Sequence, residues 1–86
     1  MYVHIGEDVM IWASDIITII EKETVDSSED IQLHLQKKAD VIEDLSHGAD
    51  YKSLVITESH IYLSPIASGT IKKRLTKLAD EELFIL

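Results

Sequence analysis

The side chains that most often carry catalysis are present in this sequence, but they do not stand in a catalytic pattern. The four histidines are His4, His34, His47 and His60, and they do not form the H-E-x-x-H zinc motif. No serine lies in the G-x-S-x-G sequence of a nucleophile elbow, and the glycines form neither a P-loop nor a dinucleotide-binding fingerprint. We therefore predict a protein that is not an enzyme and that holds no metal and no cofactor.

Thiol chemistry is excluded because the sequence contains no cysteine, so disulfides and Cys-ligated metal centres cannot form. His4 and His60 lie in predicted strands and could pair across a sheet, but we favour hydrogen-bonded structural roles for both. For the acidic residues 43–44 and 80–82 we favour solvated surface over cation binding. For Trp12 we favour a place in the core or in an interface.

One group of basic residues near the C-terminus could bind a polyanion. Lys72, Lys73, Arg74 and Lys77 occur with no acidic residue before Asp80. Lys73 and Lys77 are one helical turn apart and could contact neighbouring phosphates, and backbone N–H groups at the start of that helix could add donors. On composition alone we favour the simpler interpretation that these residues solvate the outer face of an amphipathic helix. Contact with phosphates or with a partner is the alternative.

The overall charge argues against general nucleic-acid binding. The formal net charge is −8; residues 1–50 contain twelve acidic and three basic residues, whereas residues 51–86 contain four acidic and five basic ones. An acidic chain repels the phosphate backbone at long range. Contact with DNA must therefore depend on the segregated basic cluster.

The length and composition fit one small globular domain spanning residues 1–86. The chain has 86 residues, of which 45% are hydrophobic and 28% charged, which is the usual balance of a folded domain. No segment has the roughly 18 consecutive apolar residues of a membrane span, and the N-terminus lacks the pattern of a signal peptide. We expect a cytoplasmic protein that does not contact a membrane.

The first part of the chain predicts three short strands joined as an antiparallel meander, because apolar runs alternate with turn residues. The runs are Tyr2–Ile5, Val9–Trp12 and Ile16–Ile20. The third run has no polar alternation, which is typical of a strand covered on both faces. We interpret it as a strand that helices cover on one side and another subunit covers on the other.

Two helices and a hairpin are predicted in the remainder. Residues 26–29 have the chemistry of a helix start, with Ile31, His34, Leu35 and Lys38 on one face of the helix that follows. Residues 40–45 are a weak candidate for an edge strand or a loop.

A tight hairpin and the second helix follow. The hairpin joins residues 54–57 to residues 60–63. The helix begins at residues 68–70 and places Ile71 and Leu75 on its apolar face, together with residues 78 and 79. We expect the apolar residues 83–86 to dock on other protein surface.

Two segments resemble the RemA/RemB family of small bacterial regulators of extracellular-matrix genes, and within it the RemB-type branch. The segments are YVHIGED, residues 2–8, and IYLSPIASGTIKKR, residues 61–74. The resemblance spans roughly residues 1–75. It implies an α+β subunit with a curved antiparallel sheet of about five or six strands and two helices. It also implies a ring-like homo-oligomer that acts as a transcriptional regulator of biofilm genes and binds double-stranded DNA through basic residues.

The resemblance transfers unevenly to the DNA-binding positions. In the RemA-type branch, arginines follow a glycine in the loop after the first helix, but here Gly48 is followed by Ala49 and Asp50. Asp15 also stands where that branch has an arginine. The segment 70–74 does match the RemB-type pattern. The predicted DNA-binding residues are therefore Lys52, Lys72, Lys73, Arg74 and Lys77.

Two functions remain open at this point. The first is a DNA-binding regulator in which an oligomer repeats weak contacts and gains affinity through avidity. The second is an acidic structural or interaction subunit of the same fold, which binds a basic protein partner and not DNA. The charge of the chain favours the second function, whereas the resemblance favours the first, and both predict a homo-oligomer.

Overall fold

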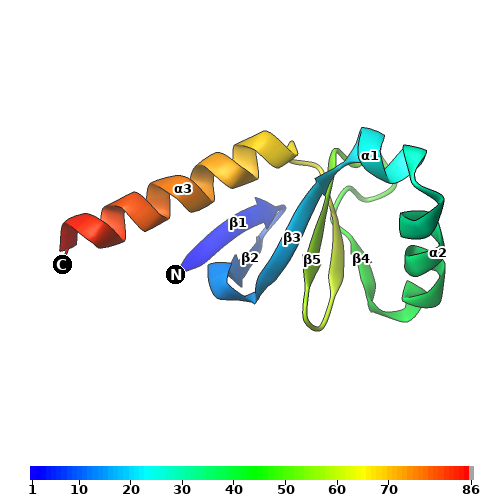
Figure 1. The fold of residues 1–86 in the computed structure, drawn as a ribbon, viewed down its shortest axis with the longest axis horizontal. Coiled ribbons are helices and arrows are strands. Elements are labelled where there is room, and N and C mark those ends of the chain that lie inside the picture. The colour runs from blue at the N-terminus through cyan, green and yellow to red at the C-terminus, as the bar shows by residue number, and fades with distance from the viewer. Residues whose placement is uncertain (86) are drawn as a thin grey trace.

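A four-stranded sheet forms the centre of the fold, with helices α1 and α2 on one face and the β1–β2 hairpin with helix α3 on the other (Figure 1). The computed structural model describes the backbone of residues 1–85 and the side chains of residues 1–77. The elements are β1 (Tyr2–Gly6), β2 (Val9–Trp12), η1 (Ala13–Asp15), β3 (Ile16–Glu21), α1 (Lys22–Ser27), α2 (Glu29–Lys37), η2 (Ala39–Val41), β4 (Ile42–Asp44), β5 (Ser53–Thr57), β6 (Ile61–Ser64) and α3 (Ser68–Ile85). The α+β class is confirmed.

The strands form two sheets, and this corrects the prediction of one curved antiparallel sheet. β1 and β2 pair with each other alone, and the larger sheet has the order β3-β5-β6-β4. β3 pairs with β5 and not with β2, so the predicted three-stranded meander is wrong. The 3-10 helix η1 separates β2 from β3 and lets the chain change sheets. β4 is an edge strand that runs parallel to β6, whereas the predicted β5–β6 hairpin is confirmed.

Three α-helices are present in the described residues, one more than predicted. The additional helix, α1, follows β3 directly and buries Val25 completely. The predicted start at residues 26–29 holds in part: residues 26 and 27 end α1, and the next helix begins after Ser28, whose side chain accepts a hydrogen bond from the Ile31 N–H (3.2 Å). The Gln32 side chain donates to the Val25 carbonyl (2.9 Å) and so joins the two helices.

The core consists of two clusters on opposite faces of the central sheet. Leu54 and Val55 are consecutive residues of β5, both without exposed surface, and they lie in different clusters. This division follows from the alternation of side chains along a strand. Ile31 and Leu35, which were predicted to share one face of the helix, lie against the Leu54 cluster, whereas His34 and Lys38 are exposed. The Ile16–Ile20 run is not covered on both faces in the monomer, because Ile17 is 63% exposed and Thr18 is also exposed.

Helix α3 is attached to the hairpin by one buried residue and one set of polar contacts. Ile71 is fully buried in the Val55 cluster. Arg74 Nη1 donates to the His4 carbonyl (2.9 Å) and lies 3.4 Å from His4 Nδ1. His4 Nε2 in turn donates to the Glu7 carbonyl (2.5 Å), which leaves Nδ1 as the acceptor for the arginine. The hydroxyl of Ser64 donates to the Ile5 carbonyl and links the hairpin to β6.

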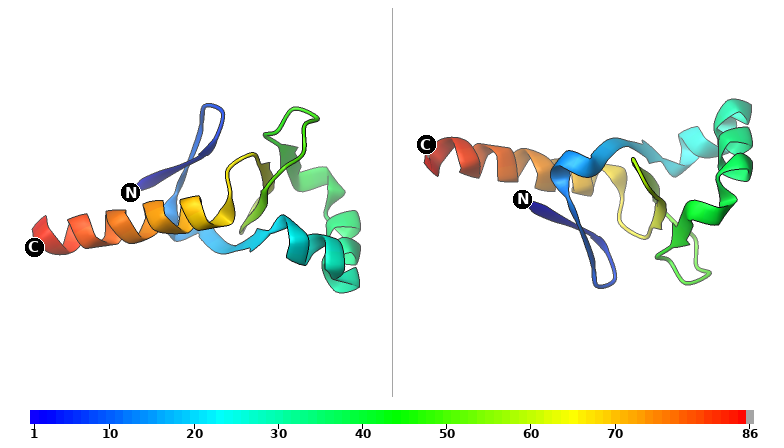
Figure 2. Two further views of the ribbon diagram at one scale, coloured as in Figure 1. Left: turned by 90° about the horizontal axis from the view of Figure 1, so that it is seen from above. Right: turned by 90° about the horizontal axis from the view of Figure 1, so that it is seen from below.

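The molecule is elongated because α3 continues beyond the sheet. Its dimensions are 43 × 23 × 23 Å, and Figures 1 and 2 show the C-terminus at one end of the long axis with α2 at the other. No helix in the described part is both long enough and apolar enough to cross a bilayer. The predicted docking of residues 83–86 concerns side chains that lie outside the described part.

Replacing Gly6 with alanine should destabilise the fold. Gly6 has φ +141°, and a Cβ there would lie 2.7 Å from Pro65 Cδ, so the variant combines an unfavourable backbone conformation with a steric clash. We expect the free energy of unfolding, measured by urea denaturation, to fall by about 1–3 kcal/mol. Gly69→Ala is the control: no atom lies within 4 Å of its Cβ position, and alanine should raise helix stability by up to about 1 kcal/mol. Equal effects of the two variants would contradict this interpretation.

Replacing Arg74 with alanine should loosen α3 from the hairpin. The variant loses a charge-assisted hydrogen bond to the His4 carbonyl, and we expect thermal unfolding to report a loss of about 1.5–3 kcal/mol. The control is Lys73→Ala, which changes an exposed neighbour and should shift stability by less than about 0.5 kcal/mol. If Arg74→Ala unfolds with unchanged stability, this contact does not hold the helix.

Candidate nucleic-acid interface

The outer side of α3 presents three lysines to solvent. Lys72, Lys73 and Lys77 are exposed, whereas Ile71 is buried and Leu75 is partly buried against the core. The helix therefore separates an apolar inner side from a basic outer side, as the amphipathic pattern predicts. This arrangement allows the three ammonium groups to approach a polyanion without disturbing the core.

Arg74 lies on a different part of the same helix. It is partly buried and directs its guanidinium to His4, on strand β1. The sequence placed it with the neighbouring lysines because it belongs to the same run. In the structure its Nη1 contacts His4 and attaches α3 to the hairpin.

Lys52 lies close to the start of α3, next to a second lysine that the sequence analysis did not single out. Lys22 and Lys52 line a shallow groove of about 380 Å³, together with Tyr51, Ala67 and Ser68. The Lys22 N–H donates to the Lys52 carbonyl (3.1 Å), and this bond continues the pairing of β3 with β5. No local sequence signal predicts that pairing, so the proximity of the two lysines could not be inferred.

Acidic residues limit the positive charge of this groove. Glu21 and Glu23 also line it. Lys22 Nζ lies 3.8 Å from an Asp50 carboxylate oxygen and 5.5 Å from the centre of the Tyr51 ring. Burial, and to a smaller extent the Asp26 carboxylate, raises the pKa of the Tyr51 phenol. The lysines of α3 are therefore the better candidates for phosphate contact, with Lys52 at their margin.

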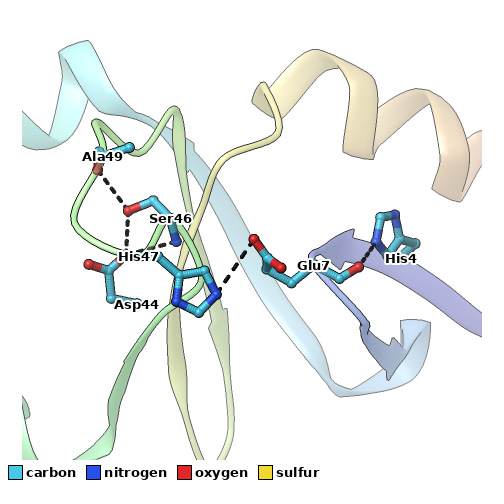
Figure 3. A network of polar contacts seen from close by, with 6 residues as sticks. All are labelled: His4, Glu7, Asp44, Ser46, His47 and Ala49. Carbon is cyan, nitrogen blue, oxygen red and sulfur yellow. Dashed lines mark hydrogen bonds and ion pairs between the residues drawn. The ribbon is translucent and has the colours of Figure 1, made fainter.

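The loop that resembles the arginine loop of the RemA-type branch is closed by its own polar contacts (Figure 3). The Asp44 carboxylate accepts hydrogen bonds from the Ser46 N–H (2.9 Å) and from the Ser46 hydroxyl. These bonds hold the pKa of the Asp44 carboxyl below its ordinary value. His47 and Gly48 adopt positive φ angles of 53° and 84° and complete the turn. The loop is therefore closed by its own polar contacts, and Ala49 and Asp50 follow Gly48, where the resemblance to the RemA-type branch would place arginines.

This loop also contacts the tip of the N-terminal hairpin. His47 Nε2 lies 3.5 Å from Glu7 Oε1, with both side chains largely exposed. Asp15, at the other position where the resemblance would place an arginine, is exposed in η1. Neither the loop after Gly48, with Ala49 and Asp50, nor η1, with Asp15, therefore carries a basic side chain at the matching position.

Three other residues considered in the sequence, His4, His60 and Trp12, contact neighbouring protein groups. His4 and His60 do not pair with each other; His4 bonds to Glu7 and Arg74, and His60 Nδ1 lies 2.9 Å from the Ser59 hydroxyl. The favoured prediction of hydrogen-bonded roles is confirmed for both. Trp12 is 47% exposed, so the core alternative is wrong; its ring lies 4.5 Å from that of Tyr2.

Comparison with known proteins identifies relatives of this chain. Residues 2–75 match the model of the RemA-like family, described as extracellular matrix regulatory protein A-like. The chain is also 34% identical over 74 residues to extracellular matrix regulatory protein B of Bacillus subtilis (strain 168). That similarity covers 86% of this chain and 89% of the relative. The resemblance to the RemB type is thereby confirmed, and the chain belongs to the RemA-like family of extracellular matrix regulatory proteins.

Proposed function

We propose that this protein is a cytoplasmic, non-enzymatic regulator of extracellular-matrix genes that binds duplex DNA as a homo-oligomer. The observation that carries the proposal is the exposure of Lys72, Lys73 and Lys77 on the outer side of α3, with no acidic residue in the run from Lys72 to Lys77. The name of the Bacillus subtilis relative supports the regulatory role.

Self-association is the second requirement, because one subunit offers few phosphate contacts. Each lysine that neutralises a phosphate contributes mainly through counterion release, with a salt slope of about −0.9 per contact. Three lysines on an acidic subunit are a weak site. Repetition of α3 in an oligomer would add such contacts on one DNA molecule, at a high effective concentration.

Apolar side chains on the surface support the proposed self-association. Tyr2, Met10 and Trp12 lie on the outward face of the hairpin, where they are 53%, 55% and 47% exposed. Tyr2 stands opposite Trp12 in the strand register. Clustered aromatic and methionine side chains of this kind are typical of contact surfaces between proteins.

The acidic interaction subunit remains the second candidate function. The observation that favours it is the concentration of twelve acidic residues in residues 1–50. In addition, Gly48 is followed by Ala49 and Asp50, where the RemA-type pattern has arginines. Such a subunit would bind a basic protein and would not bind DNA even at low salt.

Duplex DNA binding, measured by fluorescence anisotropy from low to moderate salt, separates the two functions. We expect the wild-type affinity to fall steeply with salt. Lys73→Gln with Lys77→Gln should weaken binding and make the salt slope shallower by about 0.9 for each phosphate that the lysines no longer neutralise. The control, Leu33→Glu with Gln36→Glu, changes the net charge equally at exposed positions of α2 and should bind nearly as wild type. Absence of binding at low salt would favour the acidic interaction subunit.

Self-association can be tested with two closely matched surface variants. Met10 and Leu33 are 55% and 54% exposed, on the hairpin and on α2 respectively. If the hairpin face joins subunits, Met10→Glu should weaken self-association by at least about tenfold, whereas Leu33→Glu should not change it. Native mass spectrometry and sedimentation equilibrium report the change. A wild-type protein that stays at 9.7 kDa at high concentration would rule out the oligomer.

A further inference from the structure

A groove of about 520 Å³ lies between the end of α2 and the tip of the β5–β6 hairpin. Four aliphatic side chains line it, namely Ile17, Val41, Ile56 and Ile61. Of these, Ile17 is 63% exposed and Ile61 only 3%. The groove therefore offers an apolar surface that extends from Ile61, in the Leu54 cluster, to the exposed Ile17.

Charged groups surround this apolar surface. Lys37 and Lys38 lie at the end of α2, while Asp40 and Glu58 lie on η2 and on the hairpin tip. Neither lysine takes part in an ion pair within the described residues. The positive charge of the groove is thus confined to its α2 side.

The C-terminal segment of the same chain has the complementary chemistry. Residues 80–82 are Asp, Glu and Glu, and residues 83–86 are Leu, Phe, Ile and Leu. Three carboxylates followed by four apolar residues match a lysine pair beside an aliphatic surface. The segment also lies beyond residue 75, where the match to the family model ends.

The direction of α3 decides which copy can receive this segment. The helix carries its C-terminus to one end of the long axis, whereas α2 lies at the opposite end (Figures 1 and 2). The segment of one molecule therefore cannot reach its own groove while α3 remains helical to Ile85. A second copy of the chain is the partner that supplies both charge and apolar complementarity.

We propose that residues 80–86 of one subunit dock in the groove between α2 and the β5–β6 hairpin of the next subunit. This inference rests on the proposed self-association and names a second surface for it, separate from the hairpin face of Tyr2, Met10 and Trp12. The acidic residues lie beside Lys37 and Lys38, and the apolar residues cover Ile17. The contact joins two different surfaces and is head-to-tail, so that its repetition closes a ring or extends a filament.

Mixing two defective variants tests this contact directly. The groove variant is Ile17→Glu, which places a carboxylate in the apolar floor at a position that is 63% exposed. The tail variant is Leu83→Ser with Phe84→Ser. Each should self-associate at least about tenfold more weakly than wild type. The groove variant keeps an intact tail and the tail variant an intact groove, so a labelled sample of one should bind the other with near wild-type affinity in a fluorescence titration.

Charge variants test the orientation of the segment. Lys37→Gln with Lys38→Gln should weaken the interaction several-fold, while Glu58→Gln should strengthen it, because the docked segment is acidic. The control for Ile17→Glu is Leu33→Glu, which introduces the same carboxylate at a similarly exposed position outside the groove and should leave the affinity unchanged.

The outcomes separate this contact from the proposed function. If wild type assembles but the two variants assemble equally well, or fail to bind each other when mixed, the tail-in-groove contact is wrong while the oligomer stands. If wild type does not assemble at any concentration tested, both the contact and the oligomer are wrong. DNA binding by the lysines of α3 is measured separately and does not enter this comparison.

Discussion

The fold depends on a central strand, β5, that must be covered on both faces. Leu54 and Val55 are adjacent and fully buried, and they belong to separate hydrophobic clusters. Since neither face can be left in water, each needs its own layer. α1 and α2 supply one layer, and the hairpin with α3 supplies the other. This division puts the lysines of α3 and the groove beside α2 on different sides of the sheet.

The parts of the fold that follow from local chemistry could be predicted from the sequence. The β5–β6 hairpin and the helix start within residues 26–29 depend on residues a few positions apart, and the sequence predicts both, although the cap itself is Ser28. The pairing of β3 with β5 joins segments more than thirty residues apart and depends on which apolar faces fit together. α1 has only six residues, without a side-chain cap, so neither its periodicity nor its boundaries gave a signal.

The same distinction applies to the candidate interface. The exposure of Lys73 and Lys77 follows from helical periodicity, because Ile71 and Leu75 fix the inner side of α3. The contact of Arg74 could not be predicted in this way, because its acceptor is the backbone carbonyl of His4, and nothing in the sequence links residue 4 to α3. Lys22 joins Lys52 only through the unpredicted strand pairing. The surroundings that depend on a partner distant in the chain, those of Arg74 and Lys22, were therefore the ones that the sequence did not reveal.

Charge segregation explains how an acidic subunit could act on DNA, and why assembly matters to that action. Repulsion by the net charge of −8 has a long range only at low salt, where the Debye length reaches about 30 Å, whereas contacts at the lysines of α3 operate at close range. Each added subunit adds both repulsion from its acidic residues and attraction at its α3 lysines. Salt weakens the repulsion between distant charges more than it weakens the direct contacts between lysines and phosphates. Attraction therefore exceeds repulsion only if the oligomer holds its subunits so that successive α3 helices contact the same duplex. Under the proposed function, the geometry of the contact between copies determines the spacing of those helices and thus the path of the DNA.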